Sequence, residues 1–247
     1  MRHEVKWPEL QDANLKNWHL QVDAHGANDG FIFAAVDESM ENKLKLRISL
    51  PGNYGMTYDL NNDGIFELFS LMQGSGYYTV HLYSNVAAKK YTEIGQVNFY
   101  ANLKDKDSPF YIPCQYVNYS KDSKIVQIAA ELAKEKTERQ YFEAVKDYIR
   151  THFAYDFIKA VTRTTGMRPD IDETMAKCMG ICQDLSAIVV AMLRSQGIKS
   201  KLVIGFADNH YHAWTVSEID GKDELYDPTV DVCALGKVNE YTEERVY

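Results

Sequence analysis

The chain has 247 residues, of which 45% are hydrophobic and 25% charged, and its formal net charge is −8. This composition is ordinary for a folded globular protein, and the length allows one large or two modest domains, each with its own core. No stretch approaches the roughly 20 apolar residues that a membrane-spanning helix needs, so we expect no transmembrane segment. An acidic chain with scattered Lys and Arg is not expected to bind nucleic acid through its phosphates.

Strand patterns dominate the N-terminal part of the chain. Residues 43–50 alternate polar and apolar side chains without interruption, which is typical of a half-buried strand. Asn61-Asn62-Asp63-Gly64 is predicted to form a hairpin turn, because Asn, Asp and Gly tolerate positive φ. Further strands are predicted at 55–60, 65–71, 77–83 and 96–103. Several short strands separated by turn residues predict an immunoglobulin-like β-sandwich over residues 1–110.

The hydrophobic period changes to that of a helix after Pro109. Apolar residues recur at helical spacing in two segments, at positions 125, 128, 129 and 132 and at positions 142, 145 and 149. Thr137, with Gln140 three residues later, forms a capping-box pattern before the second segment. We therefore expect a domain boundary near residues 105–115 and a second domain over residues 111–247.

The last third of the chain predicts one helix followed by three antiparallel strands. The helix is expected from Cys182 to Gln196, with Gly197 as its C-cap glycine. The strands are expected at 201–206, 211–217 and 224–226, with Asp220-Gly221 as a turn. The predicted fold class is therefore α+β.

Cys182, His212 and Asp227 are the candidate catalytic residues. Backbone amides at a helix start are unpaired and partly positive, so they favour the thiolate of Cys182 and could donate to an oxyanion. A cysteine nucleophile needs a base and a group that orients the base, and adjacent strands could bring His212 and Asp227 together. Alternation along the strand places Trp214 on the same face as His212, where its indole could exclude water.

The order of these motifs resembles the transglutaminase-like family, which belongs to the papain-like group of cysteine enzymes. The matching segments are 180–184 around the cysteine, 192–198 at the end of the helix, 212–214 at the histidine and 227–229 at the aspartate. The resemblance covers roughly residues 115–232 and also includes Tyr155-Asp156. It implies a papain-like core of helices packed on an antiparallel sheet.

The resemblance also implies roles for the three residues. Cys182 would be the nucleophile, His212 the general base and later acid, and Asp227 the orienting carboxylate. The chain would then act on amide bonds of peptide or protein substrates through a thioester. We expect hydrolysis, because transfer to an amine requires a water-excluding tunnel that this short core is not expected to form. Protein-glutamine transglutaminase cross-linking and a non-catalytic binding module on the same fold remain alternatives.

The sequence contains three other candidate sites. Cys178, Cys182, His210 and His212 could form a zinc set, although their spacing is a weak indication. Residues 59–64 copy the first half of a calcium loop, but the twelfth position is Ser70 rather than Glu. Five tyrosines could form a carbohydrate-binding face, or could simply pack as strand residues: Tyr77, Tyr78, Tyr83, Tyr91 and Tyr100.

The leading hypothesis requires no cofactor and no metal. The β-rich N-terminal region joined to such a core is similar to exported or surface proteins of bacteria, which favours an extracellular or cell-surface location over the cytoplasm. No signal peptide is visible at the start of the chain. The substrate, the oligomeric state, a second oxyanion donor and the disulfide state of Cys114, Cys178 and Cys233 are not readable from the sequence.

Overall fold

The computed structural model describes residues 2–37, 39–164, 166–234, 236 and 238–247. Contacts between residues divide the chain into two compact units, one made of Pro8–Pro109 and one made of Met1–Trp7 with Phe110–Tyr247. The domain limits expected from the sequence, 1–110 and 111–247, stay a prediction. The N-terminal segment up to Trp7 belongs to the C-terminal unit and not to the first domain, because the His3 amide donates to Gly197 O at 2.8 Å.

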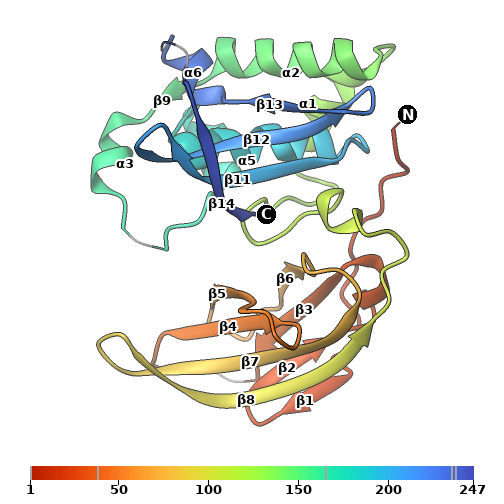
Figure 1. Cartoon of the computed structure of the whole chain (residues 1–247), viewed down its shortest axis with the longest axis vertical. Coiled ribbons are helices and arrows are strands. Elements are labelled where there is room, and N and C mark those ends of the chain that lie inside the picture. Colours follow the sequence, from red (N-terminus) through yellow and green to blue (C-terminus); the bar gives the residue numbers. More distant parts are fainter. Residues whose placement is uncertain (1, 38, 165, 235, 237) are drawn as a thin grey trace. The chain divides into compact units, whose positions relative to one another are not determined.

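The unit Pro8–Pro109 consists of two four-stranded antiparallel sheets (Figure 1). One sheet has the order β1-β2-β3-β6, with β1 Leu15–Asn17, β2 Leu20–Asp23, β3 Phe31–Val36 and β6 Glu67–Ser70. The other has the order β5-β4-β7-β8, with β5 Met56–Leu60, β4 Leu44–Ser49, β7 Gly76–Ala87 and β8 Lys90–Ala101. Single-turn 3-10 helices are η1 Ala27–Asp29 in this unit and η2 Ser108–Phe110 at its end.

Alternation along the strands builds the core of this unit. In β4, every second side chain is buried, as the uninterrupted polar–apolar pattern predicted. Tyr58 of one sheet contacts Phe69 of the other, with ring centroids 5.1 Å apart, so the two inner faces meet. The sandwich architecture agrees with the prediction from the sequence.

The turn Asn61–Gly64 does not close a hairpin. β5, which precedes it, pairs with β4, whereas β6, which follows it, pairs with β3 in the other sheet. The prediction of a hairpin was therefore wrong, because turn chemistry specifies a local change of direction and not the partner of each strand. Gly64 has the positive φ, 77°, that the turn required.

The C-terminal unit is a helical layer on an antiparallel sheet of order β13-β12-β11-β14 (Figure 1). Its strands are β11 Ser200–Ala207, β12 His210–Ile219, β13 Lys222–Tyr226 and β14 Tyr241–Val246, and β9 Ala154–Tyr155 pairs in parallel with β10 Met179–Gly180. Its helices are α1 Lys124–Ala133, α2 Glu138–His152, α3 Phe157–Thr162, α4 Ile171–Lys177, α5 Cys182–Arg194 and α6 Pro228–Val232. No helix among the described residues is long and apolar enough to span a membrane.

The helix α5 is the centre of this unit. Every residue from Cys182 to Arg194 is buried, so the helix is covered on all sides rather than along one stripe. The predicted meander of β11, β12 and β13 is present, while β14, which pairs with β11, was not predicted. The C-cap is Ser195 rather than the predicted Gly197, which lies two residues further on with a φ of 73°. The capping box of Thr137 and Gln140 is present at the start of α2.

Arg194, at the end of α5, is fully buried and ties three segments together. Its guanidinium donates to Ser200 O at 2.8 Å, Ile112 O at 2.7 Å and Tyr247 O at 2.8 Å. A hydrogen bond from a charged donor contributes about 1.5–3 kcal/mol to the free energy of unfolding. If the donor is removed, the buried carbonyl oxygens lose their hydrogen-bond partner.

Replacing Arg194 by methionine is expected to lower the free energy of unfolding by about 3 kcal/mol or more, since relief from burying a charge offsets only part of the lost bonds. Chemical denaturation monitored by tyrosine and tryptophan fluorescence would measure this. Arg150→Met is the matched control, because that guanidinium is exposed and pairs with Asp147 one turn away. It should change the free energy of unfolding by less than about 0.5 kcal/mol. Equal losses in the two variants would contradict the anchoring role of Arg194.

Candidate active site

Cys182 is the first residue of α5, as predicted, and its side chain is buried with 6% of its surface exposed. Asp184 organises this helix start. Its Oδ2 accepts from the Ile181 amide at 3.0 Å and pairs with the Lys159 ammonium, from α3, at 2.7 Å. A carboxylate in the first turn is favourable to the helix dipole and holds the residue before Cys182 in place.

His212 lies in β12 and contacts both other members of the predicted triad. Its Nε2 lies 2.8 Å from Asp227 Oδ2, so Nδ1 is the ring nitrogen that can face Cys182. Burial lowers the pKa of His212, but the hydrogen bond to Asp227 and the interactions with Cys182 outweigh burial and raise it to about 9. The imidazole of the folded protein is therefore protonated at neutral pH.

Asp227 is held at four points where β13 gives way to α6. Its Oδ1 accepts from the amides of Thr229 at 2.9 Å and Val230 at 3.4 Å, so this carboxylate is the N-cap of α6. Its Oδ2 accepts from His212 and, at 3.0 Å, from the Tyr241 hydroxyl. Pro228, which favoured a turn in the sequence, is the first residue of α6, a position that needs no amide donor.

Tyr241 is a member of the site that the sequence did not reveal. It lies in β14, the unpredicted strand, and nothing in its local sequence points to Asp227. Its ring packs against Trp214, with centroids 4.9 Å apart. Trp214 is fully buried, and its indole lies against the tyrosine that binds the carboxylate. Burial, with Asp227 nearby, raises the pKa of Tyr241, so its hydroxyl remains a donor.

Tyr155 lies on the nucleophile side of the site. It pairs in register with Gly180, two residues before Cys182, through the parallel strands β9 and β10. Burial raises the pKa of Tyr155 to about 12, and the nearby Cys182 and Cys233 add to this rise. The hydroxyl therefore keeps its proton at neutral pH.

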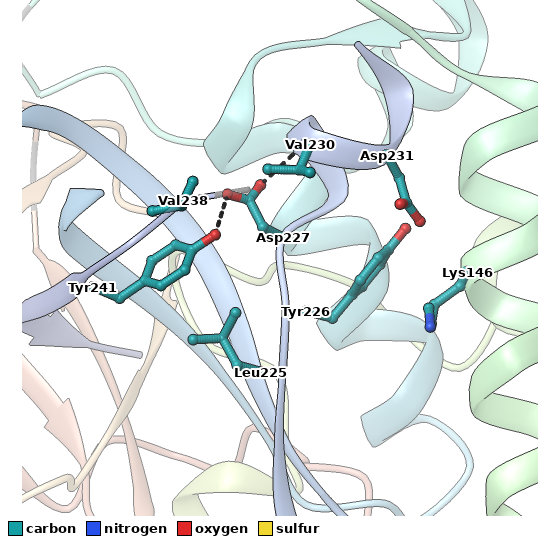
Figure 2. A pocket seen from close by; sticks show the side chains of 8 residues that line it. All are labelled: Lys146, Leu225, Tyr226, Asp227, Val230, Asp231, Val238 and Tyr241. Atoms are coloured by element: carbon teal, nitrogen blue, oxygen red, sulfur yellow. Dashed lines mark hydrogen bonds between the residues drawn. The ribbon is translucent and has the colours of Figure 1, made fainter. Parts of the chain in front are cut away.

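A cavity of about 290 Å³ adjoins Asp227 on the side of α6 and β14. Figure 2 shows the Tyr241 hydroxyl and the Asp227 carboxylate joined beside it. The lining residues are Lys146, Leu225, Tyr226, Asp227, Val230, Asp231, Val238 and Tyr241. Cys182 and His212 are not among them, so the cavity lies behind the carboxylate rather than at the sulfur.

The structure also places the residues of the three rival sites. Among the residues that the structure describes, no group of three or more His, Cys, Asp or Glu is arranged to hold a metal ion, which applies to the zinc set and to the calcium-like loop. Asp59 of that loop instead pairs with Lys45 at 2.5 Å. Of the tyrosines, Tyr78 is buried, whereas Tyr77 and Tyr100 form an exposed ring pair with centroids 4.7 Å apart.

Comparison with known proteins identifies the class of the C-terminal unit. Residues 126–223 match the Transglutaminase-like superfamily, a segment that contains Cys182 and His212 and ends just before Asp227. An uncharacterized protein of Mycobacterium leprae is 25% identical over 123 residues, which are 45% of this chain and 42% of that protein. This chain thus spans less than half the length of that relative.

Two solved structures are similar at lower identity. A candidate cysteine protease of Cytophaga hutchinsonii is 12% identical, with 94% of this chain and 90% of that chain covered and a TM-score of 0.43. Red sea bream transglutaminase is 11% identical, with 81% and 48% covered and a TM-score of 0.35. Both likenesses are too distant to inform on activity. The family match and the helix-on-sheet core together show that the chain carries a transglutaminase-like domain of the superfamily.

Proposed function

We propose that this chain is a cysteine-nucleophile enzyme that acts on amide bonds of peptide or protein substrates through a thioester. The observation that carries the proposal is His212, whose ring binds Asp227 through Nε2 and interacts with Cys182. Membership of a superfamily whose members are typically cysteine enzymes supports it. Cys182, His212 and Asp227 are the proposed catalytic residues.

The first half-reaction follows from this arrangement. The Cys182 sulfur attacks the carbonyl carbon of the amide, a C–S bond forms, and the carbonyl oxygen becomes an oxyanion. Backbone amides at the start of α5 and the neutral hydroxyl of Tyr155 are the proposed donors to that oxyanion. His212 gives its proton to the amide nitrogen, the C–N bond breaks, and ammonia or an amine leaves.

The second half-reaction regenerates the thiolate. A water molecule loses a proton to His212 and its oxygen attacks the thioester carbon, after which the C–S bond breaks and an acid is released. Asp227 holds the ring so that Nδ1 stays available to Cys182, and its charge stabilises the imidazolium. If an amine replaced the water, the same steps would give a new amide and hence cross-linking. We favour water, as in the sequence prediction.

Product analysis separates these outcomes. A glutamine-containing peptide is incubated with the protein, with and without an added primary amine, and the products are identified by mass spectrometry. We expect free acid in both reactions, whereas amine adducts would indicate the transglutaminase alternative. A thiol-directed alkylating reagent tests the nucleophile in parallel. If no product depends on Cys182, and Cys182 labels no faster than Cys114 or Cys233, the non-catalytic binding module replaces the proposed enzyme.

A further inference from the structure

Exposed apolar side chains of the C-terminal unit gather around the candidate site. Between 37% and 84% of each of these six side chains is exposed: Phe157, Ile158, Val161, Met179, Phe206 and Tyr211. They lie on α3, on β10 immediately before Cys182, and at the tip of the β11–β12 hairpin immediately before His212. A concentrated apolar surface of this kind on a globular unit marks an interaction site.

The helix α3 contributes the largest part of this surface. None of its residues is buried, and Phe157, Ile158 and Val161 are 70%, 76% and 84% exposed. A surface helix normally turns its apolar side chains toward the core, which α3 does not do. It is held instead by the ion pair of Lys159 with Asp184, a residue of the nucleophile's own helix.

Ring contacts at the two ends of α3 connect it to both sides of the site. The Phe157 ring packs against Tyr155, with centroids 5.0 Å apart. At the other end of α3, the Arg163 guanidinium lies 5.9 Å from the ring centre of Tyr211, which itself packs on Phe206 at 5.6 Å. Figure 1 shows α3 beside the β11–β12 hairpin within this unit. The apolar surface therefore extends from Tyr155, beside the strand that leads to Cys182, to the β11–β12 hairpin that carries His212.

We propose that this surface binds apolar side chains that flank the reactive amide in an extended polypeptide substrate. The inference rests on the proposed function and deepens it by naming the substrate class. A six-residue helix is about 9 Å long, which matches about three residues of an extended chain. Because Phe157 contacts Tyr155, which pairs with Gly180 two residues before Cys182, the chain that carries the amide covers this surface during the reaction, whereas a second copy of this protein seated there would block the site.

Two peptides that differ only beside the target glutamine test the proposal, one with Leu and Phe as neighbours and one with Gly. With the wild-type protein, kcat/KM is expected to be at least about tenfold higher for the apolar peptide. Ile158→Asp is expected to remove most of this preference. Ile65→Asp is the matched control, because Ile65 is also exposed, at 66%, and lies in the other unit; it should retain the preference. Thermal unfolding confirms that both variants fold.

A binding measurement separates failure of this inference from failure of the proposed function. Fluorescence anisotropy of the same labelled peptides with Cys182→Ala requires no turnover. Tighter binding of the apolar peptide, weakened by Ile158→Asp in that background, supports the docking surface even if no amide is cleaved. Equal binding and equal kcat/KM for the two peptides would overturn it while leaving the enzyme proposal intact. Binding of phosphatidylglycerol vesicles that Ile158→Asp abolishes, without any peptide preference, would overturn it in favour of a lipid surface.

Discussion

Replacing Cys182 by alanine is expected to reduce turnover of amide substrates by a factor of about 10⁴ or more, because no thioester can form without the sulfur. The effect should fall on kcat rather than on KM, since the rest of the surface is unchanged. The side chain is small, so thermal unfolding should change little. Steady-state kinetics on the glutamine peptide, with the product quantified by mass spectrometry, measures the loss of turnover.

Cys178→Ala is the matched control for this prediction. Cys178 is exposed, four positions earlier in the chain, and its sulfur contacts only the Met175 carbonyl among the hydrogen bonds of the described residues, at 3.6 Å. We expect that variant to keep the wild-type kcat/KM within about threefold, as exposed substitutions away from a site have small effects. Residual turnover in Cys182→Ala above one per cent of wild type would exclude this cysteine as the nucleophile.

Replacing Asp227 by asparagine is expected to lower kcat by a factor of about 10²–10⁴ and to shift its pH dependence. Asparagine is as good an N-cap as aspartate, so Oδ1 can keep its bonds to the amides of α6. The amide NH₂ then faces His212 Nε2 in place of an oxygen. That geometry favours the neutral ring protonated on Nδ1, which cannot deliver a proton in the way the imidazolium does.

The pH dependence follows from the direction of the His212 shift. Its pKa in the folded protein is raised from 6.5 to about 9, so protonated His212 stabilises the fold fully below pH 6.5. This contribution is lost as the pH rises from 6.5 through 9. In the folded protein the imidazolium that protonates the leaving group is lost only near its raised pKa, so kcat/KM of the wild type should fall on the alkaline side near pH 9.

In Asp227→Asn, burial of His212 is no longer opposed by the carboxylate, so the alkaline fall should move to a lower pH. Rate–pH profiles of the two proteins measure the shift. Asp231→Asn serves as the control, because Asp231 is an acid of the same helix α6, one turn beyond Asp227. An alkaline limb that stays near pH 9 without the Asp227 carboxylate would show that this residue does not set the protonation of His212.

Local features of the chain were sufficient for the helix that carries the nucleophile. The apolar residues after Cys182, the preceding glycine and the positive φ expected of Gly197 mark the position of α5 in the sequence. The alternation in β4 and the capping box of α2 were predicted for the same reason. These three features depend on residues that are close together in the sequence, so the order of the residues is enough to predict them.

Pairings between distant segments could not be predicted in this way. The turn after β5 predicted a hairpin, but β6 joins the opposite sheet of the sandwich. The strand β14 adds to β11 from some 40 residues further along the chain and brings Tyr241 to Asp227. A strand's own sequence does not state which edge it will pair with, because any extended backbone offers the same donors and acceptors.

The sequence by itself determined the members and the order of the candidate triad, since a helix start and two successive strands place Cys182, His212 and Asp227 in reach of one another. Only the tertiary structure decided how they are held. The ring nitrogen that meets Asp227, the Tyr241 hydroxyl on the same carboxylate oxygen and the ion pair of Asp184 with Lys159 depend on side chains from separate elements. The exposed apolar surface along α3 is also visible only in the tertiary structure, because the burial of a side chain depends on which elements pack against it.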